Sequence, residues 1–235
     1  MNSPLESVTA FHVGPIPVTT AVIITWALMA ALALTAFLLT RRLTITPTAR
    51  QTVIELLVEA IDSQIHDIAG SSPAPYRGFV GTLFVFILAA NWSSLLPGVE
   101  PPTANLETDA ALALLVFLSV IWFGVRRAGL AGYLKSFATP NPFMIPLNLM
   151  ESVTRTFSMF VRLFGNVMSG VFVIGIVASL AGLLVPIPLM ALDMVTGLIQ
   201  AYIFAVLAMV FIAATDSGSA ASPPGATSPR PSSKG

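Results

Sequence analysis

Residues 144–176 read MIPLNLMESVTRTFSMFVRLFGNVMSGVFVIGI, a long apolar segment that carries polar side chains at regular intervals. In an α-helix, at about 100° per residue, these polar side chains fall within roughly 80° of one another; they are Glu151, Arg155, Ser158, Arg162, Asn166 and Ser169. In a soluble protein this pattern would predict an ordinary amphipathic helix. Inside a bilayer an arginine costs about 2.5–3.5 kcal/mol, so it needs a partner, a water-filled path or a function.

The composition predicts a membrane setting. The chain has 235 residues, of which 55% are hydrophobic and 9% are charged, whereas a soluble domain has about 25% charged residues. We therefore expect an all-α polytopic membrane protein. The zero formal net charge argues against a nucleic-acid partner. Cysteine is absent and there are two histidines, so we expect no disulfide, no metal site and no cofactor.

Apolar stretches predict about five membrane-crossing helices, each long enough for a hydrocarbon core of about 30 Å; they cover residues 18–40, 78–96, 109–125, 145–182 and 189–214. Basic pairs follow the first and third stretches. By the positive-inside rule those ends are cytoplasmic, which places the N-terminus outside and the C-terminus in the cytoplasm. We expect a membrane domain over residues 18–214, an external flank over residues 1–17 and a disordered cytoplasmic tail over residues 215–235.

Residues 48–69 differ from the spans, because apolar residues at helical spacing oppose several acids. This segment is too charged to cross the bilayer. We expect an amphipathic helix that lies on the cytoplasmic membrane surface or packs against a partner helix.

The last two helices are unusually long. A single helix over residues 145–182 would measure about 55 Å at 1.5 Å per residue, so it must tilt strongly, kink or lie partly flat. Pro186 and Pro188 mark the turn of a hairpin. On the final helix, Asp193, Thr196 and Gln200 fall within roughly 60° on one face.

Polar residues also cluster toward the external side. Asn91, Ser93 and Ser94 lie at the outer end of the second span. The following segment, PGVEPPTANLETD, reads as an external loop whose acids are Glu100, Glu107 and Asp109 and whose Thr103 should be accessible from outside.

Several segments together resemble one family. RLFGN at residues 162–166 lies eleven residues after Glu151, and VIELLVEAID, PPTANLETDAALAL, PLNLMES and LIQAYIFAVLAMVFI occur in the same order as in the a subunit of F-type ATP synthases. Together these motifs are specific, although each alone is weak. The resemblance implies ATP synthesis coupled to hydrogen ion transport or transport of another cation, in the CF(0) membrane sector, through a proton channel that drives a rotary motor.

The resemblance further implies that the chain is a stator subunit beside a ring of c subunits, with b-type peripheral stalk subunits, the catalytic head and the lipid bilayer as its other partners. Ions would enter by one half-channel, bind a ring carboxylate and leave by the other. The expected location is the inner membrane of a bacterium. In this scheme Arg162 is the essential cation facing the ring, and Asn166 and Gln200 match polar positions near the channel. Ser158, Ser169, Thr196 and Arg155 are weaker channel-lining candidates.

One position departs from the family pattern. Many members place an acid and a histidine on the last two helices in the outer half-channel. Here the first position is Val171 and the second is Asp193. His12 and His66 lie in the flank and the surface helix, so Asp193 is the expected ion relay, with a purely structural role as its alternative.

Alternatives stay open at other sites. Glu151 and Arg155, at i and i+4, can form a simple helix ion pair or frame the cytoplasmic exit. The chain has no phosphate loop of the GxxxxGK[ST] kind, so we expect no catalytic site of its own. The alternative function is a self-contained secondary ion transporter or channel. An intramembrane enzyme is disfavoured because no HExxH or nucleophile motif is present.

Overall fold

The computed structural model describes residues 9–13, 16–41, 49–70, 72–95, 101–137, 144–182 and 185–219. Helices dominate the described residues. The elements in chain order are β1 (Thr9–Val13), β2 (Ile16–Thr19), α1 (Thr20–Thr40), α2 (Ala49–Ala69), α3 (Ala74–Trp92), the short 3₁₀ helices η1 (Ser93–Leu95) and η2 (Pro102–Ala104), α4 (Leu106–Phe137), α5 (Met144–Ala181) and α6 (Pro186–Ser219).

The predicted class, an all-α polytopic membrane protein, is confirmed. Five helices are long and apolar enough to cross a membrane: Thr20–Thr40, Ala74–Leu95, Leu106–Arg127, Ile145–Leu180 and Pro186–Ala214. A small antiparallel hairpin, β1–β2, precedes α1, where the sequence predicted only a polar flank. The expected tail over residues 215–235 lies mostly outside the described residues.

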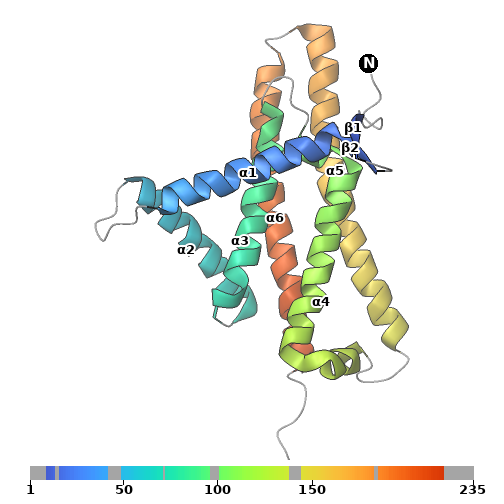
Figure 1. The fold of residues 1–235 in the computed structure, drawn as a ribbon. Helices are drawn as coiled ribbons and strands as arrows, with labels where there is room; N and C mark the ends of the chain where they lie inside the picture. The colour runs from blue at the N-terminus through green and yellow to red at the C-terminus, as the bar shows by residue number, and fades with distance from the viewer. Residues whose placement is uncertain are drawn as a thin grey trace, which may run out of the picture.

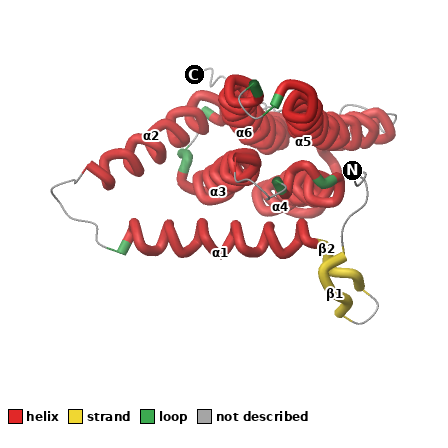
Figure 2. The backbone as a smooth tube through the Cα atoms, turned by 90° about the horizontal axis from the view of Figure 1, so that it is seen from above, coloured by secondary structure: helices red, strands yellow, loops and turns green. Residues whose placement is uncertain are grey.

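The helices form three layers when viewed from above (Figure 2): α1, then α3 with α4, then α6 with α5. Helices α3 to α6 run roughly along one another, whereas α1 lies across them (Figure 1). Helix α1 is apolar and buries no residue, so packing gives it no preferred face. Its membrane crossing therefore rests on its length and composition.

The central core joins the four helices α3 to α6. Its buried residues recur at helical spacing on each helix; they are Leu83, Ile87, Leu112, Val116, Met159, Leu163, Ala201, Phe204 and Ala208. The small side chains of α6 at this contact allow its backbone to approach the neighbouring helices closely. We call this set the central apolar layer.

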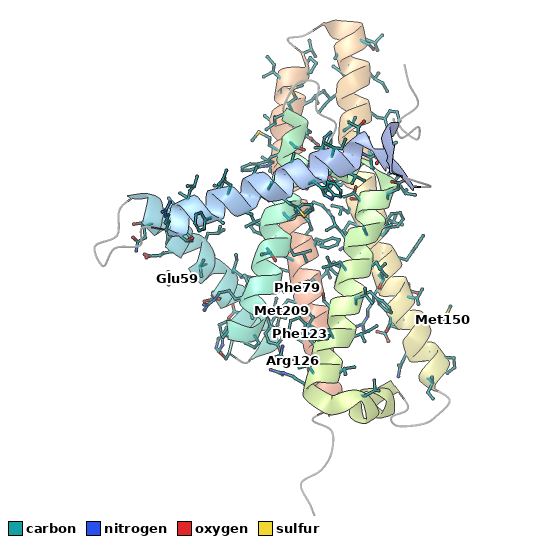
Figure 3. The ribbon with its side chains drawn as sticks, in the orientation of Figure 1. Glu59, Phe79, Phe123, Arg126, Met150 and Met209 are labelled. Atoms are coloured by element: carbon teal, nitrogen blue, oxygen red, sulfur yellow. The ribbon has the colours of Figure 1, made fainter. Side chains whose placement is uncertain are left out.

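Helix α2 packs against the N-terminal half of α3 and the C-terminal half of α6. Its Ile65 joins buried residues of α3 and α6, including Met209. The rings of Phe79 and Phe123 lie 6.1 Å apart beside this cluster (Figure 3), and the Arg77 guanidinium pairs with Asp62. The amphipathic helix α2 therefore packs against helices of the same chain, which is one of its two expected positions. Val53 and Leu56 on α2 stay exposed.

Candidate ion-translocation site

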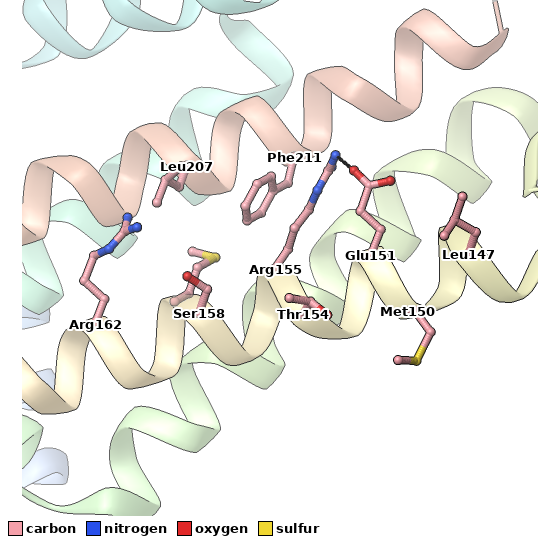
Figure 4. A pocket seen from close by; sticks show the side chains of 10 residues that line it. Leu147, Met150, Glu151, Thr154, Arg155, Ser158, Arg162, Leu207 and Phe211 are labelled. Atoms are coloured by element: carbon pink, nitrogen blue, oxygen red, sulfur yellow. Dashed lines mark hydrogen bonds and ion pairs between the residues drawn. The ribbon is translucent and has the colours of Figure 1, made fainter.

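A groove of about 590 Å³, here called the inner groove, runs between the N-terminal half of α5 and the C-terminal half of α6. The polar residues that line it are Glu151, Thr154, Arg155, Ser158 and Arg162 of α5 (Figure 4). Leu207 and Phe211 of α6 form the opposite wall. The polar wall on α5 follows from the spacing of its residues, because positions three and four apart on a helix share a face.

Glu151 and Arg155 are tied together at the inner end of the groove. The Arg155 guanidinium donates to the Glu151 carboxylate, and it lies 5.2 Å from the centre of the Phe211 ring. The helix ion pair expected from their spacing is therefore present. The positive charge of Arg155 is therefore paired with a carboxylate of the same helix.

Arg162 differs from Arg155 in its surroundings. Among the residues that the structure describes, no hydrogen bond or ion pair joins its guanidinium, and its side chain is exposed. It lies on a face of α5 with Ser158, Val161 and Gly165, all of them exposed. A charged side chain at membrane depth is expensive unless it is paired or hydrated, and the described residues provide Arg162 with no such pairing.

Asp193 anchors a second polar region near the N-terminal end of α6, here called the outer polar region. Ser94 Oγ donates to Asp193 Oδ2 at 3.4 Å, and Trp92 Nε1 donates to the Met194 carbonyl at 3.2 Å. A Cβ atom built on Gly170 would lie 2.3 Å from Asp193 Oδ1. Glycine at this position of α5 therefore makes room for the carboxyl group, directly beside Val171.

Asn91 links α3, α6 and η2 at the level of Gly197, one helical turn after Asp193 on α6. Its Nδ2 donates to the Gly197 carbonyl at 3.0 Å, and its Oδ1 accepts from Thr103 Oγ1 at 2.9 Å. A Cβ atom on Gly197 would lie 3.1 Å from the Asn91 Cβ, so the close approach of α3 and α6 requires a small residue there. The second polar region is thus held by contacts between α3, α6 and η2.

The other predicted site residues differ in burial and in hydrogen bonding. Gln200 is buried, and its Nε2 has no hydrogen-bond partner among the described residues. Ser169 and Thr196 donate to their own helices, at the carbonyls of Asn166 and Asp193. These two hydroxyl groups therefore donate their hydrogen bonds within their own helices and add little to a channel wall. Asn166 is half-buried.

The structure buries two residues of the segment that the sequence predicts as an external loop. Thr103 and Asp109 are each 0% exposed, so Thr103 is not accessible as expected, while the side of the membrane on which the segment lies stays a prediction. Thr103 is held by its bond to Asn91, and Asp109 lies in the first turn of α4. A signal was available, because Asp109 shares a helical stripe with Leu112, Ala113 and Val116, all buried.

The two polar regions are separated along the bundle. Arg162 and Gly170 are eight residues apart on α5, or about 12 Å along its axis. On α5 the buried residues within this interval are Leu163 and Val167, and Leu163 packs with Ile87 and Phe204 in the central apolar layer. The geometry therefore combines an inner groove, an outer polar region and an apolar layer beside an exposed arginine.

This combination defines a polytopic helical membrane protein whose described residues form two polar regions beside the central apolar layer. Comparison with known proteins identifies the particular family. The model for the ATP synthase A chain matches residues 22–213, so the chain belongs to the ATP synthase A chain family.

Similar proteins cover most of the chain. ATP synthase subunit a 2 of Bradyrhizobium sp. strain BTAi1 is 55% identical over 213 residues, covering 91% of this chain and 96% of that protein. ATP synthase subunit a of Albidiferax ferrireducens is 42% identical over 218 residues, covering 92% and 94%. ATP synthase subunit a 1 of Chlorobaculum parvum is 42% identical over 216 residues, covering 91% and 96%. The chain is accordingly an integral multi-pass membrane protein and an ion-translocating stator subunit of an F-type ATP synthase, within a complex of several subunits.

Proposed function

We propose that the two polar regions are the two half-channels of this subunit. The outer region around Asp193 receives the coupling ion, and the inner groove that Arg162 lines releases it on the other side. The observation that carries this proposal is the central apolar layer between them. An ion that enters at one region cannot continue straight through packed apolar side chains, because an uncompensated buried charge is very costly.

The ion therefore leaves the subunit sideways, onto a carrier that moves. In this proposal the carrier is the carboxylate of a c-subunit ring, which packs on the exposed face of α5. Ser158, Val161, Arg162 and Gly165 share that face, and no atom lies within 4 Å of a Cβ built on Gly165. This face leaves space for a neighbouring helix directly beside the arginine.

Arg162 acts on the carrier by electrostatics. A nearby cation favours the ionised form of a carboxyl group, so a ring carboxylate that reaches Arg162 releases its ion. Guanidinium is effectively always protonated, so it does not carry protons between the half-channels. The same residue therefore promotes release and blocks a leak.

The remaining assignments complete the proposal. Peripheral stalk subunits and the catalytic head are the other partners. The complex lies in the inner membrane of a bacterium, with the N-terminus of this chain outside and its C-terminus in the cytoplasm. The basic residues Arg41 and Arg126, which follow the first and third spans, support this orientation.

A cross-linking experiment tests the proposal. The chain contains no cysteine, so a Gly165→Cys variant in the assembled complex can be paired with single cysteines placed along the c-subunit helix that carries the ring carboxylate. We expect a cross-link near that carboxylate. The matched control is Leu118→Cys on the exposed side of α4, which should form none.

Two outcomes would contradict the proposal: a ring that cross-links to the Leu118→Cys variant and not to the Gly165→Cys variant, or a purified particle of this chain alone that carries the ion. The second outcome would support a self-contained transporter or channel.

A further inference from the structure

Asp109 is a buried carboxyl group to which the proposed function assigns no role. It is 0% exposed, and neither of its side-chain oxygens has a hydrogen-bond partner among the described residues. Buried carboxyl groups are normally paired or hydrogen-bonded, because burial of an isolated charge is costly. A position in the first turn of α4 favours negative charge through the helix dipole, but it does not require burial of the side chain.

The spacing along the helices places Asp109 in a polar layer just outside the central apolar layer. One turn outward from Leu112 on α4 is Asp109, one turn outward from Ile87 on α3 is Asn91, and one turn outward from Phe204 on α6 is Gln200. Positions three or four apart on a helix share a face. These three polar residues, all buried, therefore replace the apolar side chains at the next level of the bundle.

Bonds between segments support this assignment. Asn91 donates to the Gly197 carbonyl and accepts from Thr103, so α3, α6 and η2 meet at this level. The Gln200 amide nitrogen also lacks a partner among the described residues. The layer thus holds a carboxyl acceptor and an amide donor with free hydrogen-bonding capacity.

Asp193 lies outward of this layer. Four residues separate Asp193 from Gly197, which is about 6 Å along the axis of α6. Asp193 is half-buried and bonded to Ser94. The helical spacing of Asp109 from Leu112 therefore indicates a level between Asp193 and Arg162.

We propose that Asp109 is a second ion-binding carboxylate of the outer half-channel, which takes up the coupling cation inward of Asp193 and passes it on past Gln200. This inference rests on the proposed function. If the cation is a proton, one proton adds to the Asp109 carboxylate and the same proton leaves for the ring carboxylate, so no covalent bond other than O–H forms or breaks. If the cation is sodium, the carboxylate binds it with the oxygens of neighbouring side chains.

The first test removes the charge and keeps the shape. An Asp109→Asn variant, purified as the whole complex and reconstituted in vesicles, should lose at least tenfold in ATP-driven ion flux, measured both as acidification and as sodium uptake. Asp109→Glu should recover part of the flux, because it restores a carboxylate. An Asp109→Asn complex with unchanged flux of both ions would overturn the inference.

The second test does not depend on activity. In an otherwise cysteine-free complex, Asp109→Cys should react with a small cationic methanethiosulfonate reagent, because the side chain lies on a hydrated path. The matched control is Ala113→Cys, one turn inward on the same stripe and 2% exposed, which should not react. No reaction at Asp109→Cys, or equal reaction at both positions, would show that Asp109 does not lie on a selective path.

The two levels of the proposal fail in different ways. If Asp109→Asn keeps its flux while Arg162→Ala loses it, this inference fails and the proposed function stands. If Arg162→Ala also keeps its flux, the proposed function fails.

Discussion

Replacing Gly170 by alanine tests the outer half-channel with a single methyl group. The added Cβ would lie 2.3 Å from Asp193 Oδ1 and 3.1 Å from its Cγ. Ordinary van der Waals contact between such atoms needs roughly 3.5 Å or more. The carboxyl group must therefore rotate away by about 1 Å, and its bond from Ser94, already 3.4 Å long, breaks.

The magnitude follows from the displaced carboxylate. Holding a side chain away from its preferred rotamer costs about 0.5–1.5 kcal/mol, and the lost hydrogen bond to a charged group adds about 1.5 kcal/mol at the low end of its range. Together they slow ion transfer at Asp193 by roughly 30- to 150-fold, at 1.36 kcal/mol per factor of ten. Partial replacement by water reduces this, so we expect a flux loss on the order of tenfold.

The assay is ATP-driven acidification of vesicles, or sodium uptake, with the amount of this chain per complex measured in parallel. Gly175→Ala is the matched control, because no atom lies within 4 Å of a Cβ built there. Both substitutions favour the helix by about 0.5–1 kcal/mol, so a difference between them reports on Asp193. Equal flux in the two variants, with normal assembly, would refute the placement of Asp193 in the ion path.

Further predictions concern the relay and the topology. Asp193→Asn should reduce flux by more than tenfold, because the amide keeps the shape without binding a cation. Gln200→Leu should reduce flux less, because water partly replaces a polar wall. Unchanged flux in Asp193→Asn would show that Asp193 has a structural role. Adding Val171→Glu to Asp193→Asn should restore some flux in the same assay, since it supplies a carboxylate next to Gly170; no recovery would separate Val171 from the path. Cysteines at the exposed Glu107 and at Ser222, outside the described residues, should label from opposite sides of the membrane, outside and cytoplasmic respectively; labelling from one side would overturn the orientation.

The sequence predicts the fold class well for a physical reason. A stretch of about 20 apolar residues has few alternatives to a membrane helix, so α3, α4, α5 and α6 follow from composition. The direction of α1 does not follow, because a helix that is apolar on all sides carries no information about the face it packs.

The candidate site was predictable where periodicity acts within one helix. The stripe that includes Glu151 and Arg162 follows from helical spacing alone, and its inner part lines one groove. Contacts between segments were not predictable. Thr103 is buried because η2 folds back onto Asn91, and a proline-rich segment between two spans looks like an exposed loop in sequence.

The contact between Asp193 and Gly170 was likewise not predictable from the sequence. The spacing of Asp193 from Gln200 identifies it, but the register between α5 and α6 decides which residue it meets. The structure places Gly170 against the carboxyl group, because the hairpin sets that register.

The central claim, that Arg162 couples the two half-channels through a moving carboxylate, is tested most directly by ATP-driven ion flux in reconstituted complexes carrying Arg162→Ala. We predict complete loss of coupled flux with a normal amount of this chain in the complex, severe impairment in Arg162→Lys, and normal flux in the control Arg126→Ala, an exposed arginine of α4. Coupled flux retained in Arg162→Ala would contradict the account.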